Sequence, residues 1–239
     1  MSVYIKALAA LALIFASSIS QAVVINEIRI DQTGADSDEF FELYGTPGES
    51  LSDLSYLVIG DQSDIEAAID LSAYQIASDS FFLVAESSFS LNPNIDLIST
   101  LNFENNDNVT HMLVSHFTGS LHDDVDTNGD GIFDGVFWSS IVDSVALVAD
   151  ASGGDRIYST VTIGPQNNTS PAHVYHGIDG TGDWQIGSLT AGVSDSPSLT
   201  HSARRVVTVP EPSSLLLLIP GILLLMLIKP AARSPVLLD

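Results

Sequence analysis

Short runs of alternating apolar and polar residues dominate the middle of the chain. Between Ile65 and Leu71 an apolar residue occupies every odd position while Glu66 and Asp70 stand at even ones, the period-two pattern of a half-buried strand. Other segments rich in β-branched and aromatic residues predict strands at 23–30, 39–44, 54–59, 81–85, 108–115 and 142–148. Turn-forming residues separate these segments at 46–50, 60–64 and 92–94. Because no segment shows a sustained helical stripe with caps, the pattern predicts an all-β antiparallel sandwich or barrel.

The composition changes after about residue 150, where Gly, Ser and Asn become frequent. This change predicts longer loops, with strands returning near 173–176 and 184–186. The polar stretch at 189–208 is typical of a spacer. We therefore expect one β domain at 23–188, which is long enough to bury a sizeable core.

The first 22 residues have the three parts of a secretory signal peptide. Lys6 supplies the positive charge, residues 7–16 are apolar, and small polar residues lead to Ala22. The alternative is a short N-terminal core helix. We expect export through the inner membrane and a mature chain that starts near Val23. Since the chain has no cysteine, the exported domain has neither a disulfide nor a cysteine-linked lipid.

The C-terminal tail is apolar in a different way. Residues 213–228 form an uncharged, leucine-rich segment that Pro220 and Gly221 interrupt. Its length lies at the lower edge of the roughly 17–25 residues that a membrane-spanning helix needs. Lys229 and Arg233 follow directly, so the positive-inside rule places the last residues in the cytoplasm and the main domain outside. The tail is therefore predicted to be a marginal and temporary membrane anchor.

The order of features in this tail resembles a known sorting signal. Residues 209–234 begin with a motif that contains Pro210, Glu211 and Pro212, continue with the apolar segment and finish with the basic cluster of Lys229 and Arg233. This arrangement is similar to the PEP-CTERM signal of Gram-negative bacteria. The resemblance implies recognition and processing by an exosortase after transient anchoring in the inner membrane. The final location would be the cell surface or the extracellular matrix.

The charge of the central segment limits its partners. The whole chain has 30 Asp and Glu against 7 Lys and Arg, and 28 of these acids with only four arginines lie between Val23 and Thr208. Nucleic acids and anionic membrane surfaces would be repelled, so we expect no nucleic-acid partner. The same imbalance favours solubility and divalent cations.

The first forty residues of the predicted domain show a second resemblance. Asn26, Glu27 and Ile28 begin a strand, 39–43 form a Glu-Phe-Phe-Glu-Leu strand, and a Ser-Leu-x-x-Leu pattern that begins at Ser50 leads into 51–57. These motifs are similar to the start of bacterial lamin-tail domains, and 183–187 resemble the closing strand of that family. Where the family ends in a Thr-Pro-Gly-x-x-Asn element, this chain has a different sequence at 195–200. The resemblance implies an immunoglobulin-like β-sandwich, in which Glu27 and Glu42 would be structural or edge carboxylates.

The sharpest local motif is the acidic stretch at 123–134. Asp126, Asn128 and Asp130 take positions one, three and five of a calcium loop, with a glycine at six and Asp134 at nine. Phe137 stands at position twelve, where an EF-hand needs a bidentate glutamate, so a complete EF-hand is excluded. We expect a shorter Ca²⁺ loop whose shell is completed by Asp124 or a remote carboxylate. The alternative is a solvated acidic turn in which Asn-Gly supplies a positive φ.

The histidines give a weaker signal. Three of them, His111, His116 and His122, precede the acidic stretch within twelve residues, but their spacing fits no short metal-ligand motif. Strand parity places His111 opposite Met112 and Val114, which predicts a position at the surface. Parity also places His173 and His176 on opposite faces of a strand.

Catalytic motifs are sparse. The sequence has no cysteine nucleophile and no Gly-x-Ser-x-Gly elbow, and acids are too frequent for any pair to be informative. We expect a non-enzymatic, exported module with a structural or adhesive role, which contacts polysaccharide or a surface protein. Two alternatives stay open: a hydrolase of extracellular polymers with carboxylates as acid and base, and a binding subunit of another secreted protein.

Overall fold

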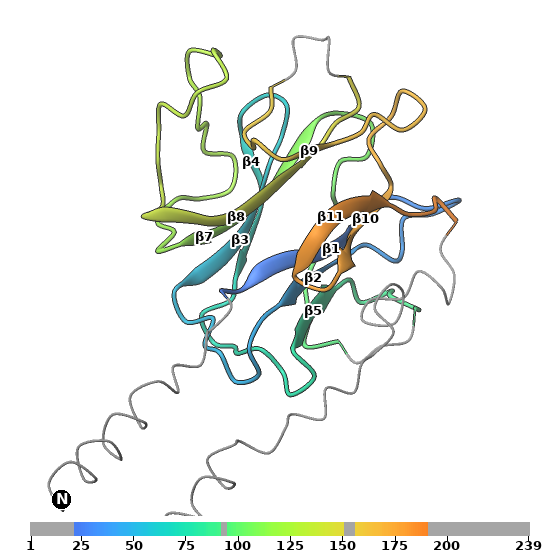
Figure 1. Cartoon of the computed structure of the whole chain (residues 1–239). Helices are drawn as coiled ribbons and strands as arrows, with labels where there is room; N and C mark the ends of the chain where they lie inside the picture. Colours follow the sequence, from blue (N-terminus) through green and yellow to red (C-terminus); the bar gives the residue numbers. More distant parts are fainter. Residues whose placement is uncertain (1–21, 92–94, 151–155, 191–239) are drawn as a thin grey trace, which may run out of the picture. The chain divides into compact units, whose positions relative to one another are not determined.

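The computed structural model describes residues 22–91, 95–150 and 156–190 (Figure 1). The predicted turn at 92–94, the signal peptide apart from its last residue, most of the spacer and the whole sorting signal lie outside these ranges. Within them no helix is long and apolar enough to cross a membrane. The strands are β1 (Val24–Arg29), β2 (Phe40–Tyr44), β3 (Leu54–Ile59), β4 (Ile65–Asp70), β5 (Phe81–Ala85), β6 (Leu97–Ile98), β7 (Val109–Ser115), β8 (Ser140–Leu147), β9 (Thr162–Ile163), β10 (His173–Ile178) and β11 (Thr181–Ile186).

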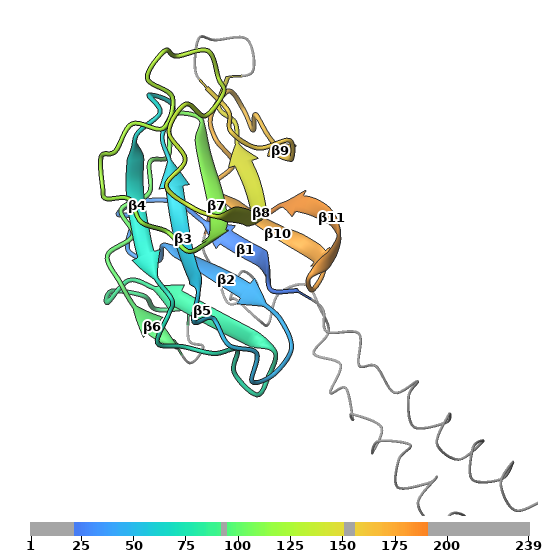
Figure 2. The ribbon, with the colours of Figure 1, turned by 90° about the vertical axis from the view of Figure 1, so that its left-hand side faces the viewer.

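Two sheets form the described part of the chain, which confirms the predicted all-β sandwich. One sheet has the order β11-β10-β1-β2-β5-β6 and the other has the order β4-β3-β7-β8-β9. Figure 2 shows β4, β3, β7 and β8 side by side in one layer and β10, β1, β2 and β5 in the other. Most strand pairs are antiparallel, as predicted, whereas at two edges β6 pairs parallel to β5 and β9 pairs parallel to β8.

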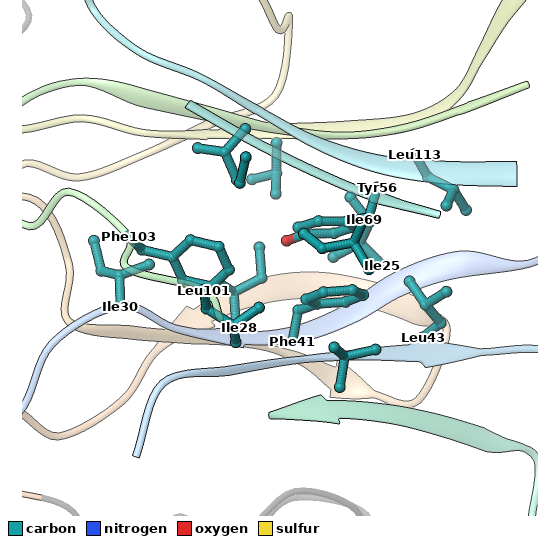
Figure 3. Packing of buried hydrophobic residues seen from close by; sticks show 14 of the residues in the cluster. Ile25, Ile28, Ile30, Phe41, Leu43, Tyr56, Ile69, Leu101, Phe103 and Leu113 are labelled. Carbon is teal, nitrogen blue, oxygen red and sulfur yellow. The ribbon is translucent and has the colours of Figure 1, made fainter. Parts of the chain in front are cut away.

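The hydrophobic core lies between the two sheets, as Figure 3 shows. Phe41 of β2 stacks on Tyr56 of β3 with ring centroids 3.6 Å apart, so this pair joins the sheets at the centre of the core. Ile25 and Ile28 of β1 and Leu113 of β7 are fully buried around it. Burial of each such side chain stabilises the fold by roughly 1.5–3 kcal/mol, which explains why a chain without disulfides can hold this architecture.

The five-stranded sheet is covered on its outer face as well. A second apolar cluster packs there, in which Val125 and Trp138 come from the long β7–β8 connection and Tyr158 from the segment after β8. They lie against Met112 and Val114 of β7, so this strand is buried on both faces.

The predicted surface position of His111 was therefore wrong. Its side chain faces the core between the sheets, is fully buried, and its Nδ1 lies 2.8 Å from the Tyr56 hydroxyl. Burial lowers the pKa of His111 to about 3, so its imidazole is neutral at physiological pH.

Candidate functional site

The acidic motif lies in the β7–β8 connection, which crosses the outer face of the five-stranded sheet. Its first residues extend the sheet at β4: His122 N–H donates to Ile65 O at 2.8 Å, and Ile65 N–H donates to Asp123 O at 3.1 Å. Phe133, in the same connection, stacks on Tyr158 with ring centroids 4.9 Å apart. The connection is thus held by backbone bonds to β4 and by the stacking of Phe133 on Tyr158.

Asp126 organises the loop from a buried position. Its carboxylate accepts N–H bonds from Gly129 at 2.9 Å, from Asp130 at 3.1 Å and from Gly131 at 2.8 Å. The Tyr158 hydroxyl donates a further bond to the Asp126 carboxylate at 3.0 Å. Asp126 is only 2% exposed. Burial raises the pKa of this carboxyl, but the bonds from Gly131, Tyr158, Asp130 and Gly129 together outweigh it and hold the pKa below its ordinary value.

The other predicted ligands form the exposed side of the same loop. Asn128 Oδ1 accepts Asp130 N–H at 2.9 Å, and Asp130 Oδ1 accepts Ile132 N–H at 2.9 Å. Asp134 accepts three bonds, from the Thr127 hydroxyl at 2.9 Å and from the backbone and side-chain nitrogens of Asn128, both at 3.1 Å. These contacts bring positions one, three, five and nine of the motif into one turn.

Asp124, which the sequence predicts as a completing ligand, bonds to the backbone at the start of the loop. Its Oδ1 accepts the N–H of Asp126 at 2.9 Å, and its backbone forms a β-bridge with Asp64. In the described ranges no group of three or more His, Cys, Asp or Glu side chains is arranged to hold a metal ion. Binding of a cation would therefore require the carboxylates of the loop to move closer together.

The structure places a basic residue at this loop that sequence reasoning did not find. Arg156 Nε lies 3.7 Å from Asp126 Oδ2, and its Nη1 donates to Asp61 O at 3.4 Å. The guanidinium passes over Gly129, where any side chain would collide with it. Arg156 is thirty positions from Asp126 in the sequence, so no spacing rule could have linked them. The positive charge of Arg156 thus lies beside the Asp126 carboxylate of the loop.

A second group of polar side chains is buried on the outer face of the six-stranded sheet. Glu27 Oε1 lies 2.8 Å from His173 Nε2, and Asn26 Nδ2 donates to Glu42 Oε1 at 2.8 Å. Asn26 also accepts the N–H of Gly180 at 2.7 Å, so it ties the β1 bulge to the β10–β11 turn. Because β1 and β2 are interior strands and both carboxylates are buried, Glu27 and Glu42 fit the structural alternative of the prediction and not the edge alternative. Asn26 and Glu27 instead connect β1 to its neighbours in the sheet, β2 and β10.

The remaining histidines do not gather into one site. His116 lies 3.8 Å from Asp53 and His122 lies 3.5 Å from Asp64. His176 packs on Trp184 with ring centroids 4.1 Å apart, away from the buried His173–Glu27 contact. The loop at Asp124–Asp134 is therefore the group of predicted site residues that the fold brings together.

The contacts described above all join residues of this one chain. Comparison of the sequence with protein-family models and with curated proteins, and of the structure with solved structures, found no match.

Proposed function

We propose that this chain is an exported, non-enzymatic β-sandwich module of the immunoglobulin-like, lamin-tail type. Its role is structural or adhesive, at the cell surface or in the exopolysaccharide matrix of a Gram-negative bacterium. The strongly acidic domain and the two-sheet fold support a binding module that contacts neutral or cationic surfaces. The sequences of the two ends support export, transient anchoring and exosortase sorting.

Calcium is the proposed regulator of this module. The observation that carries the proposal is the folded loop, in which Asp126 holds three successive backbone N–H groups and brings Asn128, Asp130 and Asp134 into the same turn. Carboxylate and amide oxygens are the donors that Ca²⁺ prefers. Asp126, Asn128, Asp130 and Asp134 would hold the ion, and Asp124 would keep the loop start in place. The bound ion would strengthen a connection that already covers the outer face of a sheet.

Thermal unfolding of the full-length protein in mild detergent tests the calcium proposal. At calcium concentrations ten times Kd we expect a gain of about 1.4 kcal/mol over EDTA, which raises Tm by roughly 3–6 °C. The exposed carboxylates Asp130 and Asp134 are the ones to replace by alanine, and both variants should lose the response. Asp183→Asn, on the exposed strand β11, is the matched control. Equal Tm values in EDTA and in millimolar calcium would reject the calcium proposal and leave an acidic turn held by Arg156.

The sorting proposal has its own experiment. Replacement of Pro210, Glu211 and Pro212 by alanine should leave the uncleaved protein in the inner-membrane fraction of a Gram-negative host that has an exosortase. Fractionation and immunoblotting measure the change. Alanines at Ser196 and Ser198, in the spacer, are the control and should leave processing intact. If the Pro-Glu-Pro variant is processed and exported like the wild type, the sorting proposal fails.

A further inference from the structure

A polar depression lies at one end of the five-stranded sheet. Its volume is about 380 Å³, and it is open to solvent. The end of β4 lies beside the start of β3, and the end of β7 lies on the other side of β3. The residues that line it include Asp53, Asp70, His116, Phe117 and three serines. The volume is at the small end of the roughly 300–1,000 Å³ that is usual for ligand sites.

Hydrogen bonds from backbone N–H groups lie around the depression. Asp70 Oδ1 accepts the N–H of Ser72 at 2.8 Å, which fixes one carboxylate. His116 N–H donates to Asp53 O at 2.8 Å, and His116 Nε2 lies 3.8 Å from the Asp53 carboxylate. His116 has a φ of 54°, a left-handed conformation that costs energy for a residue other than glycine. Here that conformation brings the imidazole next to Asp53 at the rim.

The aromatic residue of the lining is Phe117. A Cβ on Gly119 would lie 2.8 Å from the Phe117 ring and 2.9 Å from Phe137. Glycine at position 119 therefore leaves room for the ring where it lies. Phe117 also packs, partly buried, against the apolar cluster on the outer face of the sheet. Phe117 is thus packed on one side and is also a lining residue of the depression.

We infer that this depression binds one neutral sugar residue of an extracellular polysaccharide, an inference that rests on the adhesive role proposed above. The Asp53 and Asp70 carboxylates can each accept bonds from sugar hydroxyls, and bonds to charged acceptors are the strong ones. The Phe117 ring offers an apolar surface for the C–H face of a sugar. Uronic acids, sulfates and phosphates are excluded because two carboxylates on a strongly acidic domain repel them.

Other ligands fit the same lining less well. A lysine side chain of a partner would use the two carboxylates but would leave the serine hydroxyls and the Phe117 ring without a role.

Calorimetric titration of the full-length protein with four oligomers tests the inference. The probes are cellohexaose and maltohexaose, which are neutral, an alginate hexamer, which is anionic, and hexalysine. We expect binding of a neutral hexasaccharide and none of alginate. Asp53→Asn, Asp70→Asn and Phe117→Leu should each weaken this binding about tenfold or more, while Asp183→Asn should leave it unchanged.

Three results would overturn the inference: no binding of either neutral probe, tighter binding of alginate or hexalysine, or sugar binding that the three variants leave intact. If Phe117→Leu fails to fold, the two Asn variants decide, because both replace exposed carboxylates. The calcium response of Tm is measured on the same variants. A normal calcium response without sugar binding rejects the depression as a site and leaves the proposed function standing.

Discussion

Replacement of Asp126 by alanine is expected to lower the Tm of the full-length protein by roughly 6–12 °C. The variant leaves three backbone N–H groups, those of Gly129, Asp130 and Gly131, without their acceptor, and the Tyr158 hydroxyl loses its acceptor too. The three N–H groups are partly buried and the Tyr158 hydroxyl is buried, so the desolvation of these donors is no longer compensated. The loss reaches the outer apolar cluster, since Val125 directly precedes Asp126 and packs in that cluster.

The charge of Asp126 adds to this effect. Arg156 lies partly buried beside it, so removal of the carboxylate leaves a guanidinium without its nearest negative charge. Because the folded pKa of Asp126 is below the ordinary 3.8, its contribution is fully present above that pH and is lost only as the pH falls through the lowered value. The Asp126→Ala penalty should therefore be the same at pH 5 and at pH 8.

Two matched variants make the Asp126 result interpretable by differential scanning calorimetry. Asp126→Asn keeps the size of the side chain but has one acceptor oxygen in place of two, so we expect a loss between that of alanine and the wild type. Asp134→Ala removes an exposed acceptor of three bonds and should cost less. A loss at Asp126 no larger than at Asp134 would mean that the buried carboxylate does not organise the loop.

The strands with strong patterns could be predicted closely from the sequence. The predicted segments 54–59 and 81–85 coincide with β3 and β5, and the alternation from Ile65 matches the burial of β4, in which buried and half-buried residues alternate. Strands β6 and β9 have two residues each, which is too short for any periodicity. Their pairing depends on the neighbouring strand that the fold brings to them.

The wrong position of His111 and the missed Arg156 both depend on packing between segments far apart in the sequence. The prediction for His111 assumed that one face of β7 is exposed to solvent. Both faces of the strand are apolar, however: Val109 and Leu113 lie on one face, and Met112 and Val114 lie on the other. A strand with apolar residues on both parities is buried on both faces, and here the β7–β8 connection supplies the second cover. Arg156 lies after β8, and only the packing of that segment against the loop places it beside Asp126.

Between pH 6.5 and 8, the Tm of the wild-type protein is expected to fall by roughly 4–8 °C. Burial raises the pKa of Glu39 to about 8, with the Phe103 N–H acting against it and the charges of Glu86 and Asp36 adding to it. Burial also raises the pKa of Glu66 to about 8, and the neighbouring Glu104 raises it further through its charge and a side-chain hydrogen bond. In this window the folded protein keeps protons that the unfolded chain, with glutamate pKa values near 4.5, has released.

The sign of the effect follows from proton linkage. Since the folded state binds more protons than the unfolded state, a rise in pH favours unfolding until it passes the folded pKa near 8. His111 acts in the opposite direction below pH 6.5, because there the unfolded chain gains a proton that the buried imidazole does not take. The window above pH 6.5 therefore isolates the glutamates from His111.

Glu39→Gln assigns this slope to a single carboxyl. Glutamine is neutral at every pH, and its carbonyl oxygen can still accept the Phe103 N–H, which lies 3.1 Å and 3.2 Å from the two oxygens of Glu39. We expect the variant to match the wild type at pH 6.5, to exceed its Tm at pH 8 and to lose about half of the slope. Asp183→Asn, which changes an exposed carboxylate on β11, should leave the slope unchanged. Parallel curves for Glu39→Gln and the wild type would show that Glu39 is ionised in the folded protein across this range, and that the Phe103 N–H stabilises its charge more than burial opposes it.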